Sequence, residues 1–275
     1  MRLILLGLLI ISGTLSAQVP ASLVEERSAF AAWLTTAPNS PLIARAFAPI
    51  GDGIHIGPDE ANVPFPGVDA RIREEHGVIS LSGSLGARTL PRNRLVTSGP
   101  LALFISGTPG HSVVTVYGGP RLEKVPTYFP LDRSLVFTGP MLPVSPRTIR
   151  ILTIDGLETD ATEVGSVAVP DGASSIRLRV YRIVDPGSEE AELTIYFRDG
   201  TSGKGSYPAG RFVTLEPVSN GNYRLDMNRA RNPFCAYSSA YPCPAPWSGN
   251  TLTTRIEAGE RYDHEPSSPQ KQSRP

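Results

Sequence analysis

The sequence predicts an all-β protein in which one N-terminal helix precedes a small β-sandwich and a larger antiparallel β-domain, barrel-like or itself a sandwich. Short segments in which apolar and polar residues alternate recur along the chain, and this pattern is typical of half-buried strands. The 26 glycines and 27 prolines lie between these runs and indicate frequent turns. A chain of 275 residues that is 40% hydrophobic is long enough for two modest domains, each with a core.

Residues 1–17 have the features of a secretory signal peptide. Arg2 supplies a positive start, residues 3–11 are apolar, and small residues precede an expected cleavage after Ala17. An uncleaved hydrophobic anchor is the alternative, although the run is shorter than the roughly 20 apolar residues that span a bilayer. We therefore expect a secreted or periplasmic protein without a membrane span once the signal is removed.

Residues 18–50 are expected to form a helical arm and a linker. Ser22 and Glu25 fit a capping box, and Pro38 is expected to end the helix. An apolar stripe at helical spacing lies between them: Phe30, Trp33, Leu34 and Ala37. This stripe predicts an arm docked on the β core, in which Trp33 serves packing rather than ligand binding.

Residues 51–118 are expected to form the small sandwich, because the period of the apolar residues changes to two after Gly51. The expected strands include residues 54–56, 68–73, 78–81, 101–105 and 113–117. The run Gly118-Gly119-Pro120 interrupts the pattern and marks the predicted domain boundary.

Residues 121–262 are expected to form the larger β-domain, which carries a disulfide loop. Its expected strands are residues 134–138, 148–154, 164–169, 176–184, 192–197, 211–216, 223–227 and 252–256. So many short strands favour a closed barrel or a sandwich, since both protect exposed edges. Residues 263–275 carry no apolar side chain besides those of prolines, so a disordered tail is expected.

The two cysteines, Cys235 and Cys243, predict a disulfide. In an oxidising compartment two thiols in one short loop form a bridge more readily than a metal site, whose cysteines usually lie two to four residues apart. Prolines at 233, 242, 244 and 246 restrict the same loop. A redox-active pair is the alternative, but no Cys-x-x-Cys spacing supports it. Trp247 is expected to cover this loop rather than line a sugar groove.

Composition excludes several classes of partner. The chain has 26 basic and 26 acidic residues and zero formal net charge, so no global field attracts nucleic acid. No metal site or cofactor is expected, because the four histidines are scattered and none forms a close pair: His55, His76, His111 and His264. Residues 200–206 contain glycines and a lysine but lack the spacing of a phosphate loop, so a hairpin turn is expected there.

The candidate chemistry lies between residues 198 and 260. Asp199 and Asp226 are the candidate catalytic carboxylates, because paired carboxylates divide acid and base roles in hydrolytic sites. The candidate ligand-binding residues are Arg198, Lys204, Arg229 and Asn232. The alternative is a structural network in which arginine and carboxylate pairs attach loops to the sheet. Glu257 and Glu260 belong to the same set of carboxylates.

The C-terminal half resembles a bacterial family classed as a domain of unknown function, with exported and cytoplasmic members. The resemblance rests on residues 197–203 (Phe-Arg-Asp-Gly-Thr-Ser-Gly), Tyr207, residues 210–212 (Gly-Arg-Phe), residues 225–235 (Leu-Asp-Met-Asn-Arg-Ala-Arg-Asn-Pro-Phe-Cys), Cys243-Pro244, Asn250, Leu252 and residues 258–260 (Ala-Gly-Glu). Gly200, Arg231, Phe234 and Arg261 depart from the family pattern. The resemblance implies no assigned activity.

Residues 54–66 resemble the first strand and turn of forkhead-associated sandwiches. The residues that read phosphothreonine in such domains do not carry over, since Pro58 stands where an arginine follows the glycine. The resemblance therefore implies a scaffold without phosphopeptide binding.

Together these observations favour an exported, non-catalytic module that binds a small polar or anionic ligand. A hydrolase that uses the carboxylate pair Asp199 and Asp226 is the first alternative, and a protein-interaction scaffold is the second. A small molecule or another protein is the expected partner. An open pocket lined by these charges would favour ligand binding or catalysis, whereas charges neutralised internally would favour a structural role.

Overall fold

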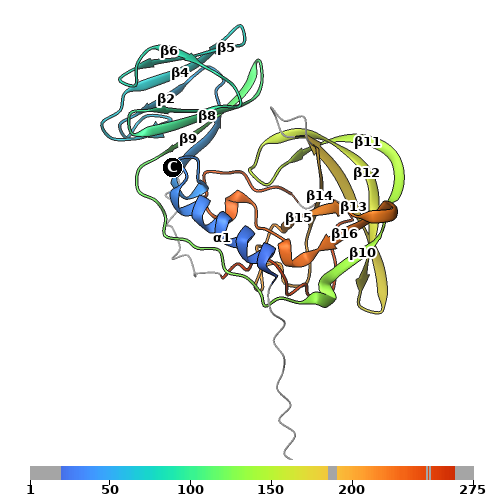
Figure 1. Cartoon of the computed structure of the whole chain (residues 1–275). Helices are drawn as coiled ribbons and strands as arrows, with labels where there is room; N and C mark the ends of the chain where they lie inside the picture. The colour runs from blue at the N-terminus through green and yellow to red at the C-terminus, as the bar shows by residue number, and fades with distance from the viewer. Residues whose placement is uncertain (1–19, 185–190, 246, 248, 264–275) are drawn as a thin grey trace, which may run out of the picture.

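The structure is a computed structural model that describes residues 20–184, 191–245, 247 and 249–263 (Figure 1). It consists of one helix, an N-terminal β unit and a C-terminal β unit, so the predicted all-β class is confirmed. The predicted signal peptide, the tail after Asp263 and Pro246 lie outside the described residues.

Helix α1 (Ala21–Thr36) begins directly after Pro20 and lies at the junction of the two β units (Figure 1). The predicted capping box is wrong, because Pro20 occupies the N-cap and Ser22 lies inside the helix without a capping hydrogen bond. The helix ends before the predicted Pro38, since Ala37 takes the extended conformation that a following proline imposes. Its Leu34 packs with Ala236 and Tyr237 of the C-terminal unit.

The N-terminal unit is a sandwich of a four-stranded and a five-stranded sheet. The first sheet has the order β1-β9-β8-β7 and the second the order β3-β2-β4-β5-β6. The strands are β1 (Ala44–Pro49), β2 (Ile54–Gly57), β3 (Val63–Pro64), β4 (Ala70–Glu75), β5 (Val78–Gly83), β6 (Arg88–Leu90), β7 (Leu95–Ser98), β8 (Leu101–Thr108) and β9 (His111–Gly118).

The core of the sandwich forms between the inner faces of the two sheets. Alternate residues of each strand point inward, so Ile56 and Ile72 of one sheet share a buried cluster with Leu103 and Val116 of the other. Strand β1 pairs with β9, so residues 44–49, expected as linker, belong to the sandwich. The last strand ends at Gly118, at the predicted boundary.

The C-terminal unit is a seven-stranded antiparallel sheet that curls into a half-barrel (Figure 1). Its order is β10-β16-β15-β14-β13-β12-β11, and β10 approaches β12 across the curl. The strands are β10 (Val136–Pro140), β11 (Leu142–Leu152), β12 (Glu158–Asp171), β13 (Ser174–Val184), β14 (Ala191–Phe197), β15 (Arg211–Pro217) and β16 (Asn222–Asp226). Neighbouring strands in the chain are mostly neighbours in the sheet, as short hairpins allow.

The two faces of this sheet carry two separate apolar clusters. One contains Leu178, Ile195 and Val213 together with Met227 from the loop that follows β16. The other contains Tyr181, Tyr196 and Phe212, on which Trp247 packs with its ring centroid 4.3 Å from that of Tyr181. Trp247 thus covers part of the second face of the sheet, and the same face continues toward α1 as the floor of a pocket.

Residues 252–256 form no strand, so this part of the strand prediction is wrong. The backbone N–H groups of Thr253 and Thr254 donate to the carboxylate of Asp171, and that of Ile256 donates to the carboxylate of Asp199 at 2.7 Å. Side-chain oxygens therefore bind these three N–H groups, while the N–H of Leu252 donates to the backbone carbonyl of Arg198 and the carbonyl of Thr254 accepts from Gly200. Of the helices in the described parts of the chain, none has the length and apolarity to cross a bilayer.

Candidate functional site

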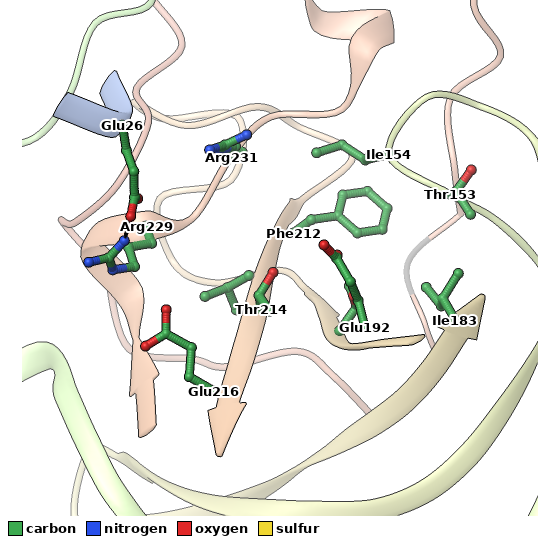
Figure 2. Close-up of a pocket in the computed structure, with 12 residues that line it drawn as sticks. Glu26, Thr153, Ile154, Ile183, Glu192, Phe212, Thr214, Glu216, Arg229 and Arg231 are labelled. Carbon is green, nitrogen blue, oxygen red and sulfur yellow. Dashed lines mark hydrogen bonds and ion pairs between the residues drawn. The ribbon is translucent and has the colours of Figure 1, made fainter. Parts of the chain in front are cut away.

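A polar pocket of about 430 Å³ lies where α1 meets the half-barrel (Figure 2). The sheet supplies its floor, α1 and the loop after β16 supply one wall, and the loop after β11 supplies another. The lining residues are Glu26, Thr153, Ile154, Ile183, Glu192, Thr194, Phe212, Val213, Thr214, Glu216, Arg229 and Arg231.

The floor follows from the two-residue period of paired strands. Thr194 of β14 lies opposite Thr214 of β15 in the ladder, so both side chains are on the same face. Glu192 and Glu216 lie two residues away on their own strands and share that face. Figure 2 shows Thr214 between the two glutamates. Two carboxylates and two hydroxyl groups thereby face the pocket.

Arg229 is held on one wall by two carboxylates. It ends the short 3₁₀ turn Met227–Arg229, in which the backbone N–H of Asn228 donates to the capping side chain of Asp226. Its guanidinium forms an ion pair with Glu26 of α1 and lies 3.5 Å from Asp226. Burial disfavours its charge, but the hydrogen bond and field of Glu26 outweigh burial and raise the pKa of Arg229 above its usual value. Arg229 is therefore a fixed positive charge.

Arg231 is the more accessible cation of the pocket. Its backbone pairs with Phe212 in both directions at 2.8 Å, which fixes the position of its Cα beside the sheet. Its side chain is exposed and lies over the ring of Phe30 at 4.9 Å. Among the described residues, none accepts a hydrogen bond or forms an ion pair with this guanidinium. Its donors therefore point to solvent or to a ligand.

The floor carboxylates are similarly available. Within the described ranges, neither Glu192 nor Glu216 has a hydrogen-bond or ion-pair partner for its carboxylate. The negative charge of Glu216 acts on Arg229 only through its field. Glu26, Glu192 and Glu216 against Arg229 and Arg231 give the pocket both signs of charge, with one more acidic group than basic groups.

Asp199, the first candidate catalytic residue, is buried in an ion pair with Arg211. The two side chains are each 1% exposed, and Nη2 of Arg211 lies 3.3 Å from Oδ1 of Asp199. Asp199 also accepts hydrogen bonds from Thr201 and from the backbone of Ile256. The guanidinium of Arg211 donates to the carbonyl groups of Ile256, Ala258 and Glu260. These contacts neutralise Asp199 internally.

Asp226, the second candidate catalytic residue, belongs to another network. Its carboxylate accepts hydrogen bonds from the backbone and the amide of Asn228 and forms an ion pair with Arg224 at 3.0 Å. Asn228 also exchanges two hydrogen bonds with the backbone of Asp132. The structure therefore does not bring Asp199 and Asp226 together as a pair in the pocket, and neither residue lines it.

Of the predicted ligand-binding residues, only Arg229 lines the pocket. Lys204 is exposed on the turn after Thr201, whose carbonyl accepts its backbone N–H. Arg198 is partly buried beside Asn250 and Thr251, with which its backbone pairs. Asn232 is buried and donates its backbone N–H to Glu260 and its amide to the carbonyl of Arg261. The hydrogen bonds of Asn232 are thus internal to the protein, whereas Nε of Arg198 is buried without a hydrogen-bond partner among the described residues.

Sequence reasoning missed Arg231 and the three glutamates of the pocket. Glu192 and Glu216 each lie two residues from a threonine on a predicted strand, and this polar alternation was the available signal. Glu26 gave no such signal, because its position depends on how α1 docks. The described part of the chain holds no group of three or more His, Cys, Asp or Glu side chains placed to bind a metal ion.

Glu260 is a fully buried carboxyl group behind the pocket wall. It accepts hydrogen bonds from the hydroxyl of Tyr237 and from the backbone N–H of Asn232, the latter at 2.9 Å. Burial raises its pKa to about 8, and the field of Arg231 opposes that shift. Folding therefore favours the protonated acid at neutral pH.

Cys235 and Cys243 both carry free thiols in this structure, so the expected disulfide is not formed in it. The two side chains are nevertheless neighbours, since their thiols are within hydrogen-bonding reach of each other. The hydroxyl of Tyr207 lies 3.2 Å from Sγ of Cys243. Burial, followed by the neighbouring thiol, raises the pKa of Cys235 to about 12, so it remains a thiol rather than a thiolate.

The known proteins that this chain resembles have no stated activity. A family described as "Protein of unknown function (DUF1684)" matches residues 123–261. One similar solved structure is the solution NMR structure of an uncharacterized protein from gene locus rrnAC0354 of Haloarcula marismortui. Its sequence is 32% identical to this chain, and the match covers 52% of this chain and 79% of that one, with a TM-score of 0.44. No curated protein matches the chain.

The buried pair of Asp199 and Arg211 predicts a large loss of stability when one partner is removed. Asp199→Asn leaves the Arg211 charge buried and uncompensated, so the free energy of unfolding should fall by about 3 to 5 kcal/mol. Urea denaturation measures this change. Glu257→Gln is the matched control, because its pair with Arg255 is exposed and should change stability by less than about 1 kcal/mol. Equal midpoints for the two variants would contradict the assignment.

Glu260 predicts stability that decreases as pH rises. Its pKa is about 8 in the folded state against 4.5 as its ordinary value, so the folded chain binds the extra proton between these values. The free energy of unfolding should therefore fall with pH across this window, by up to about 1.4 kcal/mol per pH unit. Denaturation of the wild type and Glu260→Gln between pH 5 and 8 measures the difference. A difference independent of pH would show that Glu260 is ionised throughout.

Proposed function

The chain belongs to the DUF1684 family of proteins of unknown function, and from this premise we propose that it is a non-catalytic module that binds a small polar ligand carrying both an acidic and a basic group. The proposed site is the pocket between α1 and the half-barrel. Most of its lining residues fall within residues 123–261, the region that the family covers, and Glu26 is added by the helix before it.

The presence of both signs of charge in one pocket carries the proposal. A carboxylate or phosphate of the ligand would accept hydrogen bonds from the accessible guanidinium of Arg231, next to the fixed charge of Arg229. An ammonium group at the other end would lie against Glu192 and Glu216 on the floor. The hydroxyl groups of Thr194 and Thr214 would bind between them. A purely anionic ligand would meet net repulsion from the three glutamates.

The hydrolase alternative gains no support from the two carboxylates on which it depended. Asp199 is almost completely buried in its ion pair with Arg211, and Asp226 is bound by Asn228 and Arg224. A general acid or base must lie within hydrogen-bonding reach of its substrate, and both groups already have internal partners. Their geometry is that of the structural network considered above.

We further infer that the quoted family signature encodes this buried network. Asp199, Arg211, Asp226, Asn228 and Glu260 all come from the stretches that carry the resemblance, and each is buried with several hydrogen bonds. Buried polar groups need such partners, which explains why charged and amide residues stand at these positions.

For the sandwich we propose a forkhead-associated-like scaffold without phosphopeptide binding. Its two packed sheets and the position of Pro58 directly after β2 support this proposal.

We also propose that the chain is exported and that Cys235 and Cys243 join outside the cytoplasm. The neighbouring thiols support this step, in which a thiol oxidant of that compartment takes two electrons, two protons leave and one S–S bond forms. The oxidant is required because two electrons must leave the thiols, and the raised pKa of Cys235 lowers its thiolate fraction and so slows the reaction.

Ligand binding is tested by calorimetry and thermal shift with free amino acids, each compared with its N-acetyl and carboxamide derivatives. At least one amino acid should raise Tm, since a ligand at 100 times its Kd adds about 2.7 kcal/mol. Loss of either charged group should weaken binding at least about tenfold, equivalent to about 1.4 kcal/mol.

Variants locate that binding in the pocket. Arg231→Gln and Glu216→Gln should each abolish the shift without unfolding the protein, because both side chains lack strong internal partners. Arg177→Gln, an exposed arginine of β13 outside the pocket, is the matched control and should bind normally. A panel with no shift, or a shift that survives in both pocket variants, would overturn the proposal and favour the interaction scaffold.

Export and thiol pairing are tested in a bacterial host with a periplasm, by expressing the full chain and residues 18–275. Only the full chain should reach the periplasm, and its denatured, unreduced form should resist alkylation and weigh two hydrogen atoms less than the reduced form. Closing a loop this short should add about 2 to 3 kcal/mol of stability. Cys243→Ser supplies the control with one reactive thiol. Two alkylated cysteines in periplasmic wild type would contradict the pairing.

A further inference from the structure

A second pocket, of about 340 Å³, lies between the sandwich and the half-barrel, and six of its thirteen lining residues are aromatic. The sandwich contributes Phe47, Phe104 and Tyr117, helix α1 contributes Trp33, and the C-terminal unit contributes Phe234 and Tyr241. The loop of residues 153–157 closes one side and separates this pocket from the polar pocket, because Thr153 and Ile154 line both.

The rings form a connected series rather than isolated contacts. The ring centroids of Trp33 and Phe234 are 5.6 Å apart, those of Phe234 and Tyr241 are 5.5 Å apart, and those of Tyr241 and Phe47 are 5.7 Å apart. The hydroxyl of Tyr241 donates to that of Tyr117 at 3.3 Å. These contacts fix the rings before any ligand arrives, so little side-chain entropy would be lost on binding.

The charge of this pocket is negative. Asp155 is the only acidic side chain among the described residues that line it, and none of those residues is Lys or Arg. Asp155 accepts hydrogen bonds from Thr153 and from the backbone of Leu157, which hold its carboxylate on the loop. Burial raises the pKa of Tyr117, hydrogen bonds with Tyr241 and Thr115 oppose this rise, and the field of Asp155 makes a smaller contribution in the same direction as burial.

We propose that this pocket binds a small organic ammonium ion, with its cationic head among the rings of Trp33, Phe47, Phe234 and Tyr241 and near the carboxylate of Asp155. The faces of aromatic rings are negative and attract a desolvated cation, and a quaternary ammonium group fits such a cage because it needs no hydrogen-bond acceptor. The carboxylate adds a Coulomb attraction that a neutral ligand would not gain. The amide of Asn39 and the hydroxyl of Thr115 lie at the pocket for a polar substituent.

This site is distinct from the polar pocket, because the cation would be held by rings and one carboxylate rather than by an arginine and glutamates. The two sites share the loop wall of Thr153 and Ile154. Binding at one is therefore tested independently of binding at the other by variants that line only one of them.

Choline chloride is the probe, with 3,3-dimethylbutan-1-ol as its neutral isostere and sodium chloride at equal ionic strength. The chain has two tryptophans, so a Trp247→Phe background leaves Trp33 as the sole indole that reports binding by fluorescence. Choline should give a saturable change in emission. The neutral isostere should bind at least about tenfold more weakly, which corresponds to about 1.4 kcal/mol of cation-specific attraction.

Two variants assign the contacts. Asp155→Asn preserves the oxygen that accepts from Leu157 and removes the charge, and it should weaken choline binding at least about fivefold. Phe234→Leu removes one wall of the cage and should weaken binding further while leaving an apolar side chain in place. Asp59→Asn, at an exposed position of the sandwich outside the pocket, should leave choline binding unchanged.

The proposal is overturned if choline gives no saturable change in the folded background protein, or if the neutral isostere binds as tightly as choline. It is also overturned if Asp155→Asn binds choline as tightly as the background while its Tm is unchanged. If the Phe234→Leu variant unfolds, the Asp155→Asn and isostere comparisons decide the outcome.

Discussion

The ion pair between Asp199 and Arg211 holds the C-terminal unit together, because three separate segments of the chain meet at it: the turn after β14, the start of β15 and residues 256–260. Arg211 begins β15, Asp199 follows β14, and the guanidinium also binds the carbonyl groups of residues 256, 258 and 260. Two ions in a dry interior are costly to bury, so they need many hydrogen-bond partners; both Nη atoms of Arg211 have them, and its buried Nε has none among the described residues. Asp199 meets that requirement with Thr201 and Ile256, and this fixes the irregular segment after residue 250 against the sheet.

The framework fixed in this way positions two pockets of different chemistry. Arg229 and Arg231 follow the Asp226 network and face the polar pocket, whereas Phe234 and Tyr241, a few residues later, face the aromatic pocket. Helix α1 contributes Glu26 to the first and Trp33 to the second, so the arm completes both. Trp33 therefore lines the aromatic pocket in addition to the packing role that its helical stripe predicts.

The predictions that were right depend on residues close together in the sequence, and most of those that were wrong depend on contacts between distant segments. Alternation of apolar and polar residues located most strands of both units, because burial of one sheet face is encoded residue by residue. Residues 252–256 show the same alternation, yet their backbone binds the side chains of Asp171 and Asp199, and no local pattern indicates a side chain 50 or more residues away. Ser22 matched the pattern of an N-cap residue, but Pro20 occupies the N-cap of α1. Asp199 and Asp226 had the composition of a reactive pair, but the carboxylate of Asp199 is bound by Arg211 and by the distant backbone of Ile256, and that of Asp226 is bound by its near neighbours Arg224 and Asn228.

The sequence by itself determined the all-β class, the family and the polar alternation that places Glu192 and Glu216 on one face, since all of these depend on composition, periodicity or nearby residues. Only the tertiary structure decided which charges are neutralised and which face a pocket. Burial and pairing depend on segments far apart in the chain, such as Glu26 with Arg229 and Asp199 with Arg211. A carboxylate in water and one in a buried ion pair are the same letter in a sequence, and the surroundings that distinguish them exist only once the chain has folded.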